Sequence, residues 1–492
     1  MSRWSAVTPL LPGATRVVLA GGAAAALVWL GSTHPLGLDL VAATGGEQAP
    51  VSDTSLTTAV SAMCPGDELT GITGVPDVGV DGTVLAVSAP ATLLPQEVDG
   101  EGEARLTDRR GTELAALPDE RPGEVSAALP RKGPVGVSAT GSLAPAVAAT
   151  QEWVEEGEEV RGLVTAPCLP AGSDLWLLAG GDGPGRLERL VLLNPGGNPV
   201  SADISVHGIA GQVGEVRTET VPSGGRTTLL VDAWAGDEQA PVVHVVAGGG
   251  GLQATLTETW LDGSTPRGAE TTVAAADPST VQVVPGALLG AGATLRVAVP
   301  GEEEAVARVS VLGEDGLVPT TGDTVLTVPG GATAELPLPS VPEGVYAVVV
   351  EADVPVAAAV GTDVGNGEDP GDIAWAASAP PVRDLVAAAL PTTKGVERIL
   401  HLVSTGGSAT ATVVTVRDGQ PSTARVQLSS DHAADLRLGR SDAVWVERTA
   451  GPGEVRGAVV SSSGEGTERL VSVLPLERSA VTSPVSRAFP LP

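Results

Sequence analysis

The stretch LVLLNPGGNPVSADISVHG, residues 190–208, decides the fold class, because it holds two strand patterns separated by a turn. Its first four residues are an unbroken apolar run, which stops at the turn sequence NPGG. From Val200 to Val206 apolar and polar residues then alternate. A period of two predicts an antiparallel strand that is buried on one face.

The same pattern recurs about 105 residues further along. Residues 295–313, LRVAVPGEEEAVARVSVLG, align with residues 190–208 without a gap, and a third version lies near residues 400–419 with one inserted residue. A period of this size is one small domain, too long for a solenoid turn or a propeller blade. With six or seven short strands in each period, the sequence predicts an all-β protein of tandem immunoglobulin-like β-sandwich repeats.

The length of 492 residues allows several such domains behind one N-terminal hydrophobic segment. We predict a cytoplasmic stub with a transmembrane or signal segment, a linker, four repeats in a rod and a flexible tail. Their bounds are 1–40 for the stub and helix, 41–63 for the linker, 64–160 for a diverged first repeat, 168–262, 275–365 and 375–477 for the other repeats, and 478–492 for the tail.

Residues 17–33 carry no charge and follow Arg3 and Arg16. An uncharged stretch of this length is slightly short of a membrane span, and the uncharged residues after it make up the difference. Basic residues before it and acidic ones after it predict a cytoplasmic N-terminus and an extracytoplasmic bulk. The alternative is a signal peptide cleaved near residues 41–43, after which the protein would be secreted.

The net charge of −31 gives the protein an acidic surface. Only Lys132 and Lys394 are lysines, and arginine supplies the remaining positive charge. Such a surface repels nucleic acid and anionic lipid, so we expect no nucleic-acid partner. Aromatic residues make up 2% of the chain, and the cores must therefore consist mainly of Val, Ala and Leu.

The chain has two cysteines, Cys64 and Cys168, and both follow the export segment. Outside the cytoplasm two thiols tend to be bridged, so we predict a disulfide between them. Each cysteine opens a repeat in the sequence pattern. The bond would join the first repeat to the start of the second.

Motifs of catalysis are missing from the sequence. The five histidines are isolated, there is no Gly-x-Ser-x-Gly elbow, and the Gly-x-Gly-x-x-Ala match at residue 249 joins two strand patterns instead of a strand and a helix. We therefore predict no enzymatic activity, no catalytic residues and no cofactor.

One acidic loop is the best cation candidate, because oxygen-rich loops can hold Ca²⁺ between sandwich domains. A solvated linker is the alternative, since the spacing does not match an EF-hand. The possible calcium ligands are Asp363, Asn366, Glu368, Asp369 and Asp372.

Trp153 and Trp260 occur at one repeat position, 107 residues apart. This recurrence favours packing at the end of a domain, and exposed rings that stack on sugar are the alternative. The packing interpretation predicts that both rings are largely buried.

Four features of the second repeat belong together: Cys168, the block WLLAGG that begins eight residues later at 176–181, the run LVLLNP at 190–195, and the alternation from Val200 to Ile204. In these features the chain resembles an actinobacterial family of exported, membrane-anchored proteins of unknown function. The third repeat departs from this pattern, because it lacks the Asn and the Trp. The resemblance implies sandwich repeats behind an N-terminal anchor, and it implies no catalytic residues.

These observations lead to one function and one alternative. We predict a non-enzymatic, extracytoplasmic structural or interaction protein of the cell envelope, held to the membrane by its N-terminal helix and partnered by an unidentified envelope protein. The alternative is a protein that binds cell-wall polysaccharide.

Overall fold

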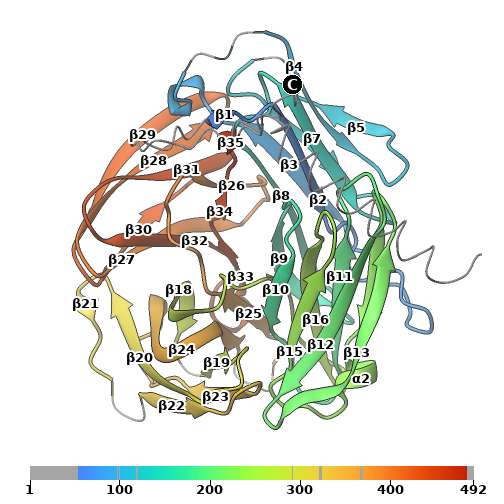
Figure 1. Cartoon of the computed structure of the whole chain (residues 1–492), viewed down its shortest axis with the longest axis vertical. Helices are drawn as coiled ribbons and strands as arrows, with labels where there is room; N and C mark the ends of the chain where they lie inside the picture. The colour runs from blue at the N-terminus through green and yellow to red at the C-terminus, as the bar shows by residue number, and fades with distance from the viewer. Residues whose placement is uncertain are drawn as a thin grey trace, which may run out of the picture. The chain divides into compact units, whose positions relative to one another are not determined.

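The protein is all-β in the part that the computed structural model describes, which is residues 54–484 without 97, 99, 118–119, 291, 321–323 and 366–368. Figure 1 colours the strands in chain order from blue to red. The segment 17–33 lies outside the described residues, so the membrane or signal helix stays a prediction. Within residues 54–484, no described helix has the length and apolar character needed to cross a membrane.

Each of the four repeats contributes one sheet with the same strand order. The first two of these sheets are β6 (Glu124–Ala128), β3 (Gly82–Ser88), β8 (Val147–Glu156) and β9 (Arg161–Pro167), and β14 (Arg226–Leu230), β11 (Arg186–Leu193), β16 (Gln253–Asp262) and β17 (Thr265–Val273). The other two are β23 (Thr333–Pro337), β19 (Ala293–Ala298), β24 (Gly344–Val364) and β25 (Asp372–Ala377), and β30 (His432–Arg437), β27 (Glu397–Thr405), β32 (Glu454–Ser463) and β33 (Leu470–Pro475). The repetition read from the sequence is therefore present in the strand pairing.

A second antiparallel sheet completes each repeat. In the first two repeats it consists of β2 (Ala59–Cys64), β7 (Val135–Gly141), β4 (Gly102–Thr107) and β5 (Glu113–Ala116), and of β10 (Asp174–Leu178), β15 (Val242–Ala247), β12 (Val200–Gly208) and β13 (Gly211–Val221). In the third it consists of β18 (Ser279–Leu289), β20 (Ala305–Gly313), β21 (Gly316–Leu317), β22 (Val325–Val328) and the first part of β24, and in the fourth of β29 (Gln420–Leu428), β28 (Ala409–Arg417), β31 (Ala443–Ala450), β26 (Val386–Ala389) and β34 (Glu477–Arg478). Short helices lie at Ala91–Leu93, Asp232–Ala235 and Gly466–Glu468.

The strand that begins at Val200 behaves as its alternation predicts. In β12, Val200, Ala202, Ile204 and Val206 are buried, and the residues between them are exposed or half-buried. The preceding NPGG sequence is a turn, in which the side chain of Asn194 accepts a hydrogen bond from the Gly196 N–H at 2.9 Å. The short-range reading of this stretch is confirmed.

The apolar run before that turn is buried on both faces of β11. Leu190 and Leu192 belong to the core of the second repeat, and Val191 and Leu193 pack against Met63 of the first repeat. A strand covered on both faces needs a continuous apolar sequence instead of an alternating one. The run therefore indicates where one repeat meets another.

The rod expected from the sequence is wrong, because the last strands of the four repeats form a closed cycle of contacts. β9 contacts β17, β17 contacts β25, β25 contacts β33, and β33 contacts β9. The Thr165 N–H of β9 donates to the Ser472 hydroxyl of β33 at 3.1 Å, and Arg398 pairs with Glu152 at 2.6 Å. The fourth repeat thus binds the first, although 307 residues separate Thr165 from Ser472.

A buried carboxyl group stands where all four of these strands meet. Asp372, at the start of β25, accepts hydrogen bonds from the backbone N–H groups of Ile373 at 2.9 Å, Val471 at 2.8 Å and Ala269 at 3.4 Å. The Leu163 backbone of β9 adds a further hydrogen bond to the group. Burial raises the pKa of Asp372 well above its usual value, in spite of these donors.

Two of the central strands fall outside the predicted repeats, and a third crosses a predicted boundary. β9 and β17 lie between the repeat bounds 64–160, 168–262 and 275–365, and β25 begins before the predicted fourth repeat although it pairs with β24 of the third. The linker and tail also differ from expectation, because β1 (Thr54–Leu56) pairs with β35 (Thr482–Pro484).

The disulfide between Cys64 and Cys168 is confirmed, with the two Cα atoms 4.1 Å apart. Its position differs from the expected one. Both cysteines lie in the core of the first repeat, where the bond joins the end of β2 to the residue after β9 and hence one sheet to the other.

We expect loss of the disulfide to destabilise the fold strongly. Replacing both cysteines with alanine, or reducing the wild-type protein, should lower the free energy of unfolding by roughly 4 kcal/mol, because the bond closes a loop of 104 residues. Denaturant midpoints with and without reductant measure this. The double variant is the control, since its midpoint should not respond to reductant; equal midpoints for oxidised and reduced wild type would contradict the prediction.

Asp372→Ala should also be severely destabilising. It leaves buried backbone donors of several repeats without an acceptor, and each such group costs about 1–3 kcal/mol. We expect a loss of at least about 3 kcal/mol in denaturant unfolding. The matched control is Asp353→Ala, which removes an aspartate that accepts an exposed backbone hydrogen bond from Val306; similar losses for the two variants would refute the special role of Asp372.

Candidate functional site

A polar cleft of about 280 Å³ lies between the second and third repeats. Two tryptophans and two arginines line it, together with five glycines. The lining residues are Gly180, Gly181, Asp182, Gly183, Arg186, Gln239, Trp260, Gly292, Thr294, Arg296, Glu335, Gly361, Thr362, Asp363, Ile373 and Trp375.

Arg296 of β19 binds the second repeat through its backbone. Its guanidinium donates to the carbonyl oxygens of Ala179 at 2.8 Å, Pro241 at 2.9 Å and Gly180 at 2.9 Å, and it pairs with Glu335 at 2.7 Å. The Arg296 side chain is only 3% exposed, and burial lowers its pKa. One side chain therefore clamps two repeats together.

The clamp appears where the third repeat departs from the second. Arg296 is aligned with Val191, and both follow a leucine at a shift of 105 residues. Val191 makes an apolar contact with the first repeat, and Arg296 makes polar contacts with the second. The sequence showed this difference, an arginine where the preceding repeat has a valine. It could have indicated a polar contact between the second and third repeats, and the sequence analysis did not predict that contact.

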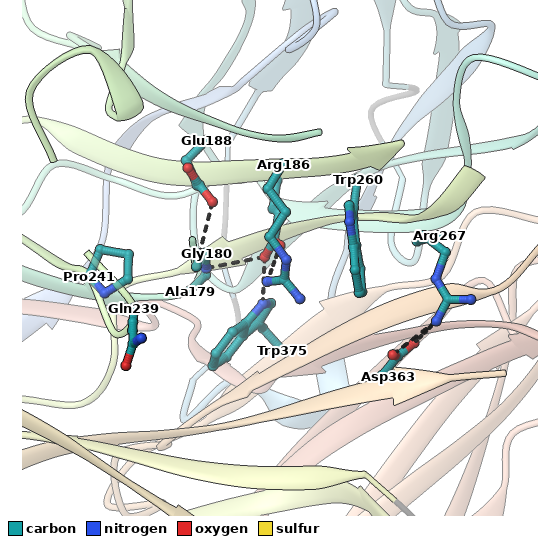
Figure 2. A network of polar contacts seen from close by, with 12 residues as sticks. Ala179, Gly180, Arg186, Glu188, Gln239, Pro241, Trp260, Arg267, Asp363 and Trp375 are labelled. Atoms are coloured by element: carbon teal, nitrogen blue, oxygen red, sulfur yellow. Dashed lines mark hydrogen bonds and ion pairs between the residues drawn. The ribbon is translucent and has the colours of Figure 1, made fainter. Parts of the chain in front are cut away.

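Glu258 is a buried acceptor behind the residues that line the cleft. It is fully buried, and it pairs with Arg186 at 2.6 Å and accepts hydrogen bonds from the Trp375 indole N–H at 2.8 Å and the Gly180 N–H at 3.1 Å (Figure 2). The Trp375 ring lies over Gly361 of the neighbouring strand, where a Cβ atom would come within 2.8 Å of the ring. Only glycine at position 361 leaves room for the indole.

Trp260 lies between two arginines. Figure 2 shows its ring edge-on, with Arg186 on one side and Arg267 on the other. The guanidinium carbons are 4.2 and 5.0 Å from the ring centroid, and Arg267 also pairs with Asp363 at 3.1 Å. Cation–π contacts of this kind occupy both faces of the ring, so a sugar ring has no free face to stack on.

Glu188 faces Glu258 from the adjacent strand. Burial, together with the nearby carboxyl groups of Asp232 and Glu258, raises the pKa of Glu188 to about 9, and the group is protonated at neutral pH. Its Oε1 accepts a hydrogen bond from the Gly181 N–H at 3.0 Å. Neither Glu188 nor Glu258 lines the cleft, so the two carboxyl groups are not placed to act on a ligand. They instead accept hydrogen bonds from the backbone N–H groups of Gly181 and Gly180 and so hold the loop that begins there.

The arginines at and beside the cleft are each paired with a carboxylate. Arg186 pairs with Glu258, Arg267 with Asp363, and Arg296 with Glu335. The arginines therefore do not form a site of excess positive charge, and the arrangement is suited to hydrogen bonding more than to holding an ion.

The predicted calcium loop is not assembled in the part of it that the structure describes. Asp363 pairs with Arg267, and both oxygens of Asp372 face backbone N–H groups in the centre of the fold, which rules out Asp372 as a loop ligand. Asp369 is exposed, and Asn366 and Glu368 lie outside the described residues. Nowhere among the described residues do three or more His, Cys, Asp or Glu side chains form a group that could hold a metal ion.

Trp153 is a core residue. Its side chain is 1% exposed and its indole N–H donates to Glu68 at 3.0 Å. Burial raises the pKa of Glu68 to about 7. Trp153 is therefore placed for packing and not for sugar stacking, whereas Trp260 is half-buried at the cleft wall.

The matched family covers most of the repeats. A family described as "Family of unknown function (DUF5719)" matches residues 123–439, which include the second and third repeats and the cleft between them. The chain belongs to the DUF5719 family.

Other comparisons add little to this family assignment. No curated protein matches the DUF5719 chain at a significant level. A solved structure titled "Biofilm associated protein - BSP domain" is 10% identical, with 85% of this chain and 96% of that chain covered and a TM-score of 0.14. A TM-score this low is too small to indicate a shared fold or function.

The two tryptophans of this DUF5719 protein should respond differently to truncation. Trp153→Ala removes a fully buried ring and should cost ~3–5 kcal/mol in denaturant unfolding. Trp260→Ala should cost no more than about 2 kcal/mol, because the ring is half-buried and contacts arginines instead of a core. Trp234→Ala is the control, since Trp234 is also half-buried beneath an arginine. Equal losses for Trp153 and Trp260 would contradict this assignment.

Proposed function

We propose that the protein is a non-enzymatic, extracytoplasmic structural or interaction protein of the cell envelope, built from immunoglobulin-like repeats and anchored by its N-terminal segment. The observation that carries the location is the Cys64–Cys168 disulfide, because such bonds persist in oxidising compartments and are rare in the cytosol. The acidic charge of −31 agrees with a soluble extracytoplasmic surface that rejects nucleic acid.

The structural role is supported by how the repeats are joined. Buried arginines cross between them: Arg226 of the second repeat donates to the carbonyl oxygens of Pro65 and Asp67 of the first, and Arg398 of the fourth pairs with Glu152 of the first. Each such group is costly to bury and is satisfied by the neighbouring repeat. A chain that fixes its repeats in this way suits a rigid platform for a partner protein.

A second candidate is the binding of cell-wall polysaccharide. The cleft between the second and third repeats favours it, because several polar side chains converge on one hollow. Purified wall polysaccharide should then retain the full chain in a pull-down. An unrelated acidic β-protein serves as the control for retention by charge alone.

Protease access in cells stripped of their wall tests the location. We expect the segment beyond residue 41 to be digested from outside while the membrane remains intact, with a cytoplasmic marker protein protected. An N-terminus at Thr44 in the mature protein would favour the secreted alternative over the anchored one. Complete protection of the chain would refute an extracytoplasmic location, and cross-linking in the same cells, followed by mass spectrometry, would identify the partner.

A further inference from the structure

We propose that the cleft between the second and third repeats binds a single uncharged sugar unit through hydrogen bonds to its hydroxyl groups. This inference rests on the second candidate function, the binding of wall polysaccharide, and it names the site and the part of the ligand that enters it. Three features of the cleft support such a ligand: its free polar groups, its paired arginines and its volume.

Several side chains at the cleft have hydrogen-bonding capacity that the described part of the protein does not use. The side chains of Asp182, Gln239 and Thr294 line it without a hydrogen-bond partner among the described residues. Arg186 uses only Nη1, towards Glu258, and Glu335 uses only Oε1, towards Arg296. Free donors and free acceptors therefore surround the same hollow.

A polyhydroxylated ligand fits this mixture. Each hydroxyl group both donates and accepts, so it can bridge a guanidinium N–H and a carboxylate oxygen at once. Hydrogen bonds to charged groups contribute more to binding than hydrogen bonds between neutral groups. A ligand that only accepts, or only donates, would leave half of these groups unpaired.

The charge pairs favour an uncharged ligand. An anionic sugar would meet Asp182 and Glu335 as well as Arg186, and a cationic sugar would meet Arg186 and Arg296. The arginines at and beside the cleft are each paired with a carboxylate, so an anionic sugar finds no unpaired cation. The unpaired carboxylate, Asp182, is exposed, and solvent screens its attraction for a cationic sugar. Charged ligands would lose hydration without a compensating partner.

The size and the walls of the cleft limit the ligand to one unit held by its edges. The volume of about 280 Å³ is close to the lower end of ligand sites. Both faces of Trp260 are covered by guanidinium groups, so the ring offers only an edge. Gly181 and Gly183 keep the adjacent loop clear of side chains, and a Cβ atom at either would come within about 3.1 Å of Arg186.

Titration calorimetry on the full chain tests the proposal with named probes. These are the neutral sugars glucose, galactose, mannose and arabinose, with glucuronate and glucosamine as charged counterparts. We expect at least one neutral sugar to bind, and to bind more tightly than its charged counterpart. Failure of all four neutral sugars, or tighter binding of glucuronate or glucosamine, would overturn the proposal.

Two variants locate the binding without touching the clamp. Gln239→Ala and Thr294→Val each remove one free polar group, and each should weaken the sugar about fivefold to tenfold, the effect of one hydrogen bond. Gln212→Ala, an exposed glutamine outside the cleft, is the matched control and should bind like wild type. Unchanged denaturant midpoints establish that the variants are folded.

The outcomes separate the site from the function on which it rests. Sugar binding that survives both cleft variants would overturn the site and leave polysaccharide binding standing. A second result would also overturn the site and leave polysaccharide binding standing. In it, wall polysaccharide retains wild type, Gln239→Ala and Thr294→Val equally, and no neutral sugar binds. Loss of wall retention altogether for the wild-type chain would refute the second candidate function together with the site.

Discussion

The carboxyl group of Asp372 is the constraint on which the closed arrangement of the four repeats depends. Backbone N–H groups from β17, β25 and β33, with a contribution from β9, converge on its two oxygens. The group is fully buried, and its removal from water is costly unless those donors are in place. Because the donors come from different repeats, the group is satisfied only when all of them have folded and met.

The central strands of the four repeats make different contacts on their outward faces. Leu85 of β3 packs on Trp445 and its neighbours in the fourth repeat, and Val191 of β11 packs on Met63 of the first. Arg296 of β19 clamps the second repeat, whereas His401 of β27 binds Asp435 within its own sheet. Identical interfaces would let the repeats pair in several orders, and the first three contacts differ in chemistry.

The cleft follows from the polar contacts between the second and third repeats. Where Val191 and Leu193 meet Met63, by contrast, apolar side chains pack against one another directly. Arg296 instead binds carbonyl oxygens at fixed distances, and the glycines around it add no side chains. A hollow with free polar groups remains between the second and third repeats, and it is the place where we propose that a sugar unit binds.

The sequence alone determined the local structure and the covalent link. The alternation from Val200 to Val206, the turn at Asn194 and the pairing of Cys64 with Cys168 depend on neighbouring residues or on there being only two thiols. The tertiary structure alone decided that the repeats close on themselves, that Asp372 belongs to the centre instead of a calcium loop, and that Trp260 is covered by Arg186 and Arg267. The first two features join residues of different repeats, up to 307 positions apart, and a pattern within one repeat contains no information about which surface of another repeat it will meet. The third brings together three strands of one sheet, and their side-chain directions follow from the strand register instead of the local sequence.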